Sequence, residues 1–183
     1  MKKFLLLSLV ICLLCGCEKA APEYLISGIG VQKNGKDYEV CFEAIIINTE
    51  NTKQTLKVLK GKGNTIYDAA KDIKAQVTQP LLMSHSGVVA VAENINGQDL
   101  KEVCQYARRT GVTLSSYVIK TENPQKLFET KPLSSACVGY DIMGLIKQNK
   151  RYKNRIFEVI SGDYKTAIPT IKVKDGGLVF EGD

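Results

Sequence analysis

The chain has 183 residues, of which 44% are hydrophobic and 24% are charged, and its formal net charge at pH 7 is +6. This is the composition of an ordinary globular protein with one or two domains. The positive excess is mild and only 7% of the residues are aromatic, which argues against a dedicated nucleic-acid-binding protein.

The amino terminus has the pattern of a secretory signal peptide, which we place at residues 1–16. Two lysines precede an apolar run, residues 4–14, that is too short to cross a bilayer as a permanent helix. The run ends in Leu-Cys-Gly-Cys, which resembles the bacterial lipobox. We therefore expect a diacylglyceryl group on the sulfur of Cys17 and a short lipidated tether over residues 17–23. An ordinary secreted protein would instead carry an A-x-A-like cleavage site.

The six cysteines do not form a metal or disulfide framework in the mature chain. Two of them leave with the signal peptide and Cys17 takes the lipid, so that only Cys41, Cys104 and Cys137 remain. These three are far apart in apolar contexts, no C-x-x-C motif survives, and there is a single histidine. We expect buried free thiols and no metal site.

The first part of the fold is predicted to contain three strands, Tyr24–Lys33, Asp37–Asn48 and Gln54–Lys60. The dipeptide Asn34-Gly35 between the first two is a strong hairpin signal. The second strand is apolar on both faces at its far end, which predicts a central position. The lone G-x-G of Gly28 and Gly30 lies within a strand and opens no helix, so it indicates a bulge or close packing and not a phosphate site.

A helix and a buried strand follow. The helix is predicted to be capped by Asn64 or Thr65 and to bury one face. That face contains Ile66, Ala69, Ala70, Ile73 and Val77. Pro80 ends any continuation, and the apolar run Gly87–Ala92 has the length of a buried strand.

The remainder alternates helices and strands before it closes with a hairpin. We expect the helix Gln98–Arg109, the strand Val112–Thr121, a short helix with Asn123 as cap and Pro124 in its first turn, a helix from Ser134 or Ser135 to Gln148, helical structure over Tyr152–Ser161, and a hairpin of Ile168–Lys174 with Leu178–Glu181. The predicted fold class is α/β (α+β-like), a single domain with a mixed β-sheet and helices packed on it.

Two stretches carry a family resemblance. Gly63, Thr65, Ile66 and Ala69 form G-x-T-I-x-x-A, and the second stretch, L-x-x-S-H-S-x-V-V-x-V-A-E, contains Ser84, His85, Val88, Val89, Val91 and Glu93. This pattern resembles the Ger(x)C family of spore-germination lipoproteins, and the resemblance runs from the lipobox to about residue 173. It implies that residues 24–165 are the family's N-terminal domain and that residues 166–183 begin a truncated following domain.

The resemblance also implies a function. The protein would be similar to the C subunit of a nutrient germinant receptor, which is not an enzyme and needs no cofactor. It would be held by the lipid on Cys17 to the outer face of the cytoplasmic membrane, which becomes the spore inner membrane, beside membrane-embedded A and B subunits. An alternative from another class is a stand-alone lipoprotein that binds a small solute at the cell surface.

His85, with Ser84 and Ser86 on either side, is the first candidate site. Catalysis is the least favoured role because no G-x-S-x-G motif accompanies the histidine. We expect structural hydrogen bonding, with contact to a partner protein as the alternative.

A basic cluster is the second candidate site. It contains Lys147, Lys150, Arg151, Lys153 and Arg155. Such a cluster can face an anionic bilayer or a partner, although a solvated helix end is the commoner explanation. The residues that we name as a possible interface are His85, Ser84, Lys150, Arg151, Lys153 and Arg155.

Overall fold

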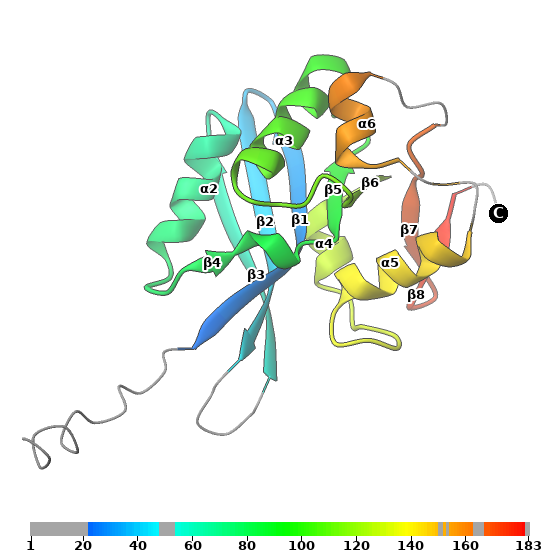
Figure 1. Ribbon diagram of the computed structural model, residues 1–183, viewed down its shortest axis with the longest axis horizontal. Coiled ribbons are helices and arrows are strands. Elements are labelled where there is room, and N and C mark those ends of the chain that lie inside the picture. Colours follow the sequence, from blue (N-terminus) through cyan, green and yellow to red (C-terminus); the bar gives the residue numbers. More distant parts are fainter. Residues whose placement is uncertain (1–21, 48–53, 150–151, 153, 163–166, 182–183) are drawn as a thin grey trace, which may run out of the picture.

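The computed structural model describes residues 22–47, 54–149, 152, 154–162 and 167–181, and these form a single α/β domain around a mixed sheet (Figure 1). Its strands are β1 (Glu23–Asn34), β2 (Asp37–Ile47), β3 (Gln54–Gly63), β5 (Val88–Ala92) and β6 (Tyr117–Thr121), in the order β3-β2-β1-β5-β6. A two-residue strand, β4 (Leu81–Leu82), also pairs with β1. The predicted fold class is confirmed.

Strand β1 joins an antiparallel half of the sheet to a parallel half. It pairs antiparallel with β2 through a tight turn at Gly35, whose φ of 63° is accessible to glycine without strain. It pairs parallel with β5 on its other side, and β6 is parallel to β5. Strand β2 lies between β1 and β3, as its two apolar faces predict.

One face of the sheet is covered by three helices, α2 (Ile66–Ala75), α3 (Gly97–Arg109) and α6 (Ile156–Ser161). Thr65 caps α2 by accepting a hydrogen bond from the backbone N–H of Asp68 at 3.1 Å. The helix then buries Ile66, Ala69, Ala70 and Ile73, four of the five residues of the predicted face. Val77 lies after the helix and is partly buried against the same core.

The other face is covered by α4 (Pro124–Phe128), α5 (Val138–Gln148) and the hairpin of β7 (Ile171–Lys174) and β8 (Gly177–Phe180). The register of β1 against β2 shifts between Ile26 and Gly28, so the predicted bulge lies here. A Cβ atom on Gly28 would collide with the ring of Phe128, which shows that the glycine allows α4 to approach the sheet closely.

Five predicted boundaries are wrong by three residues or more. The strand predicted to end at Lys60 continues to Gly63, and the strand predicted to begin at Ile168 begins at Ile171. The strand predicted from Val112 begins at Tyr117, because residues 112–116 form a turn with a hydrogen bond from Ser116 N to Thr113 O at 3.1 Å. The helix predicted from Ser134 or Ser135 begins at Val138, because the preceding segment is held by Asp141.

The fifth wrong boundary is that of the helical segment predicted over Tyr152–Ser161. Its described helical part is Ile156–Ser161, because Arg155 pairs with Tyr117 as an isolated β-bridge and Asn154 O accepts a hydrogen bond from Val118 N.

The hairpin packs on the domain that precedes it. Ile171 and Phe180 are buried in the core on the α5 side, and Tyr152 stacks on Phe180 with ring centroids 4.5 Å apart. The chain leading into the hairpin continues the sheet beside β6, where Lys120 N donates to Pro169 O at 2.8 Å.

The three cysteines of the folded part are confirmed as buried free thiols. Burial raises the pKa of Cys41 to about 12, that of Cys104 to about 12 and that of Cys137 to about 11. A thiol with so high a pKa is a poor nucleophile at neutral pH, so these residues pack as small apolar side chains. Among the described helices, none is long and apolar enough to cross a membrane.

Candidate functional site

The Ser-His-Ser segment lies in a short turn that leads into β5. Residues Met83–His85 form a 3₁₀ turn, η1, in which Ser84 and His85 are exposed. Ser86 is buried, its N–H donates to Met83 O at 3.0 Å, and its carbonyl oxygen accepts the Ser116 hydroxyl at 2.7 Å. The segment is therefore held by the hydrogen bonds of Ser86, while the side chain of His85 is exposed at the surface.

The imidazole of His85 makes no hydrogen bond to any residue that the structure describes. The structural hydrogen bonding expected from the sequence is therefore not found in this part of the chain. A surface position leaves the ring free to contact another molecule, so the interface role stays a prediction.

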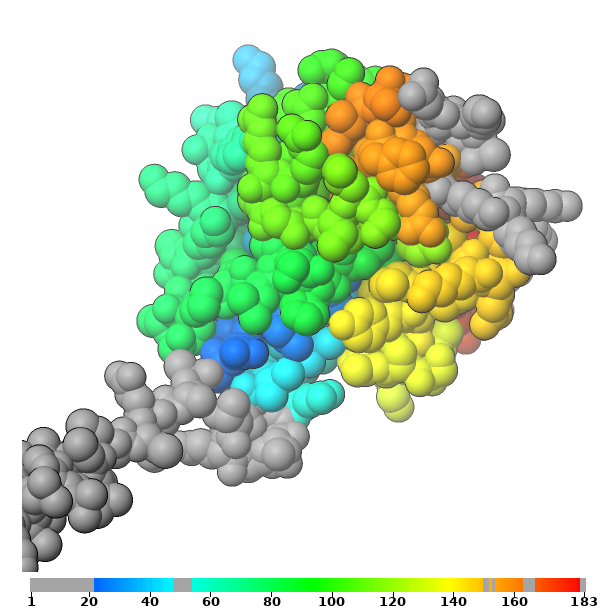
Figure 2. Space-filling view, viewed as in Figure 1, coloured from blue at the N-terminus to red at the C-terminus, as the bar shows by residue number. Residues whose placement is uncertain are grey.

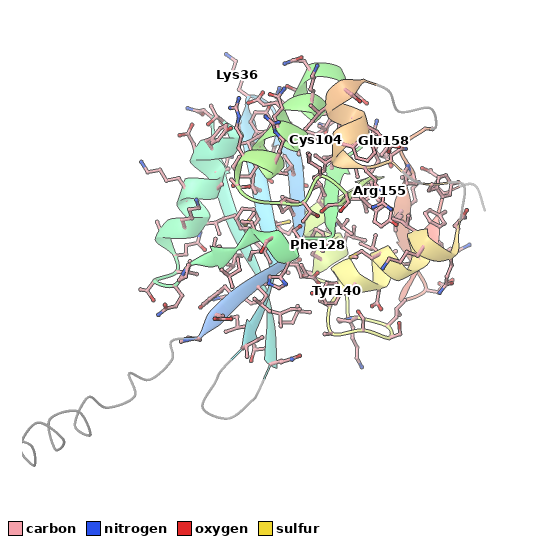
Figure 3. All side chains as sticks on the ribbon, in the orientation of Figure 1. Lys36, Cys104, Phe128, Tyr140, Arg155 and Glu158 are labelled. Atoms are coloured by element: carbon pink, nitrogen blue, oxygen red, sulfur yellow. The ribbon has the colours of Figure 1, made fainter. Side chains whose placement is uncertain are left out.

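Arg155 is the one member of the predicted basic interface that the structure describes. Its guanidinium stacks over the Tyr117 ring at 4.4 Å from the centroid, donates to Tyr117 Oη at 3.1 Å and also donates to Ser115 O. Arg155 is half-buried and its side chain is fixed by these contacts, whereas a side chain at a solvated helix end would be exposed (Figure 3). Lys150, Arg151 and Lys153 lie outside the described residues, as does Cys17.

A pocket of about 240 Å³ is lined by two residues of the basic cluster, Lys147 and Arg155, and by Gly87, whereas Ser84 and His85 do not line it. We call it the Arg155 pocket, and it is lined by Gly87, Thr113, Ser115, Ser116, Tyr117, Met143, Lys147 and Arg155. It lies where β5 and β6 begin, between α5 and the residue that precedes α6. Figure 2 shows this side of the molecule, where the orange α6 and the yellow α5 meet the yellow-green segment before β6.

Gly87 explains how α5 approaches this pocket. A Cβ atom at this position would collide with the sulfur of Met143, and the Gly87 N–H donates to Ser27 O at 3.1 Å. The glycine thus lets α5 pack against the start of β5. Sequence reasoning placed Gly87 in the strand and did not connect it with residues of the basic cluster, because their proximity arises only from the tertiary fold.

A second feature that sequence reasoning missed is a buried carboxylate at the start of α5. Glu43 is fully buried on β2 and accepts hydrogen bonds from Val138 N at 2.7 Å, Gly139 N at 2.8 Å and Ser27 Oγ at 2.7 Å. Cys137, the residue that precedes α5, makes no side-chain cap, so Glu43 of β2 caps the helix instead. The signal was present as a single acid within the apolar run of β2.

Two effects of opposite sign act on the pKa of the Glu43 carboxyl group. Burial raises the pKa of Glu43 above its ordinary value, and the hydrogen bonds from Ser27, Gly139 and Val138 oppose that rise. The three donors belong to α5 and to the bulge of β1. The buried carboxylate therefore keeps its hydrogen bonds only while both segments stay in place. We interpret these hydrogen bonds of Glu43 as a structural connection that fixes the start of α5 on the sheet.

A third region is a groove of about 320 Å³ over β1, β2, β3 and α4, with Gly30, Cys41 and Pro124 among its lining residues. The lysines at its rim are neutralised within the protein. Lys62 pairs with Asp37 at 3.3 Å and Lys60 pairs with Glu129. The groove therefore offers a ligand no uncompensated lysine charge, in contrast to the Arg155 pocket.

The comparison with protein families identifies a domain family. A family model described as the spore germination protein N-terminal domain matches residues 23–170. No curated protein and no solved structure matches the chain. The matched range contains every strand of the main sheet and the whole lining of the Arg155 pocket.

Proposed function

We propose, from the premise that this chain belongs to the spore germination protein family through its N-terminal domain, that it is a lipid-anchored subunit of a nutrient germinant receptor. The family match over residues 23–170 gives the protein a role in spore germination, and this match is the observation that carries the proposal. Beyond this role, we propose a membrane anchor and partner subunits. The sequence of the amino terminus and the surface of the domain support both additions.

The anchor is assigned to Cys17. The residues before it have the pattern of a signal peptide with a lipobox, and β1 begins at Glu23, six residues further along the chain. A linker of six residues spans at most about 20 Å, so the lipid would hold the domain close to the membrane surface. The proposed location is the outer face of the cytoplasmic membrane, which becomes the spore inner membrane.

The partner contact is assigned to the Ser84–His85 turn. Both side chains are exposed and the backbone beneath them is fixed through Ser86, so this turn presents a preformed surface. The proposed partners are the membrane-embedded A and B subunits, and the chain acts on them by contact and not by catalysis.

Two measurements on spore membranes test the proposal. The first compares the wild type with Cys17→Ala by fractionation, and we expect the variant to leave the membrane fraction. If mature-sized variant protein stays firmly on membranes, the anchor lies elsewhere. The second measurement purifies the tagged protein from solubilised spore membranes and identifies the proteins that accompany it. We expect multi-spanning receptor subunits.

The contact surface has its own variant and control. His85→Ala should reduce recovery of the partner subunits while leaving the free energy of unfolding within about 0.5 kcal/mol of the wild type, since His85 is exposed. Lys126→Ala on α4 changes an equally exposed residue and should leave recovery unchanged. Purification of the wild type without any partner, but with a bound small molecule, would instead favour a stand-alone solute-binding lipoprotein.

A further inference from the structure

The Arg155 pocket has two cationic side chains and no acidic one among its described lining residues. Neither Lys147 nor Arg155 has a carboxylate partner among the described residues, whereas Lys33, Lys60, Lys62 and Lys172 all do. The nearest acid along the chain, Glu158, accepts the backbone N–H of Arg155 at 2.8 Å and so serves the start of α6. Two cationic residues thus line one cavity, and neither is paired with a carboxylate in the part of the chain that the structure describes.

The guanidinium of Arg155 is already oriented for a ligand. An arginine has five N–H donors, and here one bond to Ser115 O and one to Tyr117 Oη use two of them. The Tyr117 ring supports the guanidinium from one side. The remaining donors are held in a fixed direction, so binding a ligand would cost little side-chain entropy.

The turn before β6, which Arg155 contacts through Ser115 O, supplies hydroxyl groups to the pocket. Thr113 Oγ1 lies 2.9 Å from Ser116 Oγ, and Ser115 Oγ donates to Thr113 Oγ1 at 3.4 Å. Because the Ser116 hydroxyl donates to Ser86 O, the Thr113 hydroxyl donates to Ser116 Oγ. Ser115 is exposed and its hydroxyl makes only the long bond to Thr113, so it is the hydroxyl that can turn towards a ligand. The lining residues with donors therefore come from three segments, α5, the residue before α6 and the turn before β6.

We propose that the Arg155 pocket binds a phosphoryl group. A tetrahedral anion has oxygens that can accept from donors in several directions at once, whereas a carboxylate presents two oxygens in one plane. Lys147, Arg155 and Ser115 line the pocket from three different segments, which suits the tetrahedral case. This assignment is independent of the receptor role proposed above.

The phosphoryl group can come from a phospholipid headgroup or from free phosphate. Two exposed apolar side chains lie beside the pocket and beside each other, Leu114 at 44% exposure and Phe157 at 48%, joined by a hydrogen bond from Phe157 N to Leu114 O at 3.2 Å. An apolar pair next to a cationic site suits a membrane surface, while the pocket alone suits a soluble ion. The experiment separates these two sources.

The primary test is a titration of the purified protein with inorganic phosphate, followed by the NMR shifts of the backbone amides of Gly87, Ser115 and Ser116. Acetate at equal ionic strength is the comparison anion. We expect saturable shifts with phosphate and much smaller ones with acetate. Lys147→Gln should weaken phosphate binding about tenfold, the effect of losing one charge-assisted contact. Lys126→Gln removes a similarly exposed charge on α4 and should leave the affinity unchanged.

Arg155→Gln should weaken phosphate binding at least as much as Lys147→Gln. Because Arg155 also holds Ser115 and Tyr117, its variant can lose structure, whereas Lys147 is exposed and makes no described side-chain contact that folding needs. Lys147→Gln therefore decides the outcome. Equal shifts with acetate, no saturation with phosphate, or an unchanged affinity in Lys147→Gln would each overturn the proposal.

A second arm identifies the source of the phosphoryl group. Wild type and Lys147→Gln are compared for binding to phosphatidylcholine vesicles with and without phosphatidic acid. Any acyl anchor on the protein acts equally in both variants, so only their difference counts. A preference for phosphatidic acid that Lys147→Gln loses assigns the site to a lipid headgroup. Phosphate binding without such a preference assigns it to a free phosphoryl compound.

Discussion

The Glu43 carboxylate accepts a hydrogen bond from the backbone N–H of Gly139 at 2.8 Å, although 96 residues separate the two in sequence. The contact joins the centre of β2 to the first turn of α5. Gly139 has no room for a side chain, since a Cβ atom would lie 2.9 Å from Ser27 O and 3.0 Å from Glu43 Oε2. The position of α5, and with it one wall of the Arg155 pocket, depends on this pair.

The first prediction concerns the charge of that carboxylate. Glu43→Gln keeps the shape of the side chain but places an NH₂ group among donors, so at least one buried N–H or O–H loses its acceptor. We expect the free energy of unfolding to fall by about 1–3 kcal/mol, measured by chemical denaturation.

Glu39→Gln is the matched control, since Glu39 is half-exposed on the same strand and the same face of the sheet. We expect this variant to stay within about 0.5 kcal/mol of the wild type. Equal stabilities of the two variants would contradict the capping role of Glu43.

The second prediction uses two glycines with opposite surroundings. Gly28→Ala adds a methyl group where the Phe128 ring already lies, so we expect a loss of about 1–3 kcal/mol of stability. Gly144→Ala adds one within α5 where no atom lies within 4 Å, so we expect a gain of about 0.5–1 kcal/mol from helix propensity. Thermal denaturation of both variants measures the two changes in stability, which should have opposite signs. A destabilised Gly144→Ala protein would show that α5 tolerates less change than its packing indicates.

Much of the fold is readable from local patterns. The turn at Gly35, the cap at Thr65 and the periodic face of α2 each use neighbours in the sequence, so the hairpin and the first helix were predicted almost to the residue. The buried run of β5 was equally clear.

Contacts between distant segments explain what the sequence did not predict. Tyr117 rather than Val112 begins β6, because the strand starts only where Gly87 O is available to accept the Tyr117 N–H at 2.9 Å. Likewise Asp141, an acid within the predicted helix, holds the loop before it and delays the start of α5. These boundaries depend on hydrogen-bond partners that are brought close by the tertiary fold, and the periodicity of a local segment does not identify such partners.

The candidate site was predicted in parts but not as a whole. His85 and Arg155 were selected from the sequence as a lone histidine and a charge cluster, and the structure places Gly87 and Arg155 on the same pocket. The hydroxyl residues of the turn before β6 were assigned to a strand, so their place in the pocket lining was missed. Glu43 was passed over because one acid in an apolar run has no local signature of a cap.

The third prediction is a pH dependence at Asp141. This carboxylate accepts hydrogen bonds from Leu133 N at 2.6 Å and from Ser134 N at 3.2 Å. Burial acts to raise the pKa of Asp141, but the hydrogen bonds from Leu133 and Ser134 outweigh it and hold the pKa below its ordinary value. The stabilisation is therefore fully present above the pKa of an unfolded aspartate, and it is lost as the pH falls through the lower pKa of the folded state.

Unfolding of Asp141→Asn across the acid range checks this sign. At neutral pH we expect the variant to be about 1–3 kcal/mol less stable than the wild type, the scale of hydrogen bonds to a charged group. Because the wild type loses its advantage on protonation, the two curves should converge below about pH 4. A difference that stays constant down to the folded pKa would mean that the ionised form contributes nothing.

The fourth prediction concerns how firmly the terminal hairpin is attached. The ring of Phe180 is 5% exposed in the core beside α5, while its neighbour Val179 is 39% exposed, so the two form a matched pair on one strand. We expect Phe180→Ala to cost about 3 kcal/mol and Val179→Ala less than about 0.5 kcal/mol. Native-state hydrogen exchange locates the effect, since the Lys120 amide donates to Pro169 O and reports whether the hairpin is docked.

In the wild type the hairpin amides should exchange faster than those of β5, because β5 lies within the sheet between β1 and β6. In Phe180→Ala the Lys120 amide should exchange faster still, while the Ala90 amide, which exchanges only when the sheet opens, should change no more than global stability requires. If both amides accelerate equally in Phe180→Ala, the hairpin and the sheet open as one cooperative unit. In that case the β7–β8 hairpin is an integral part of the domain and not an attachment that opens by itself.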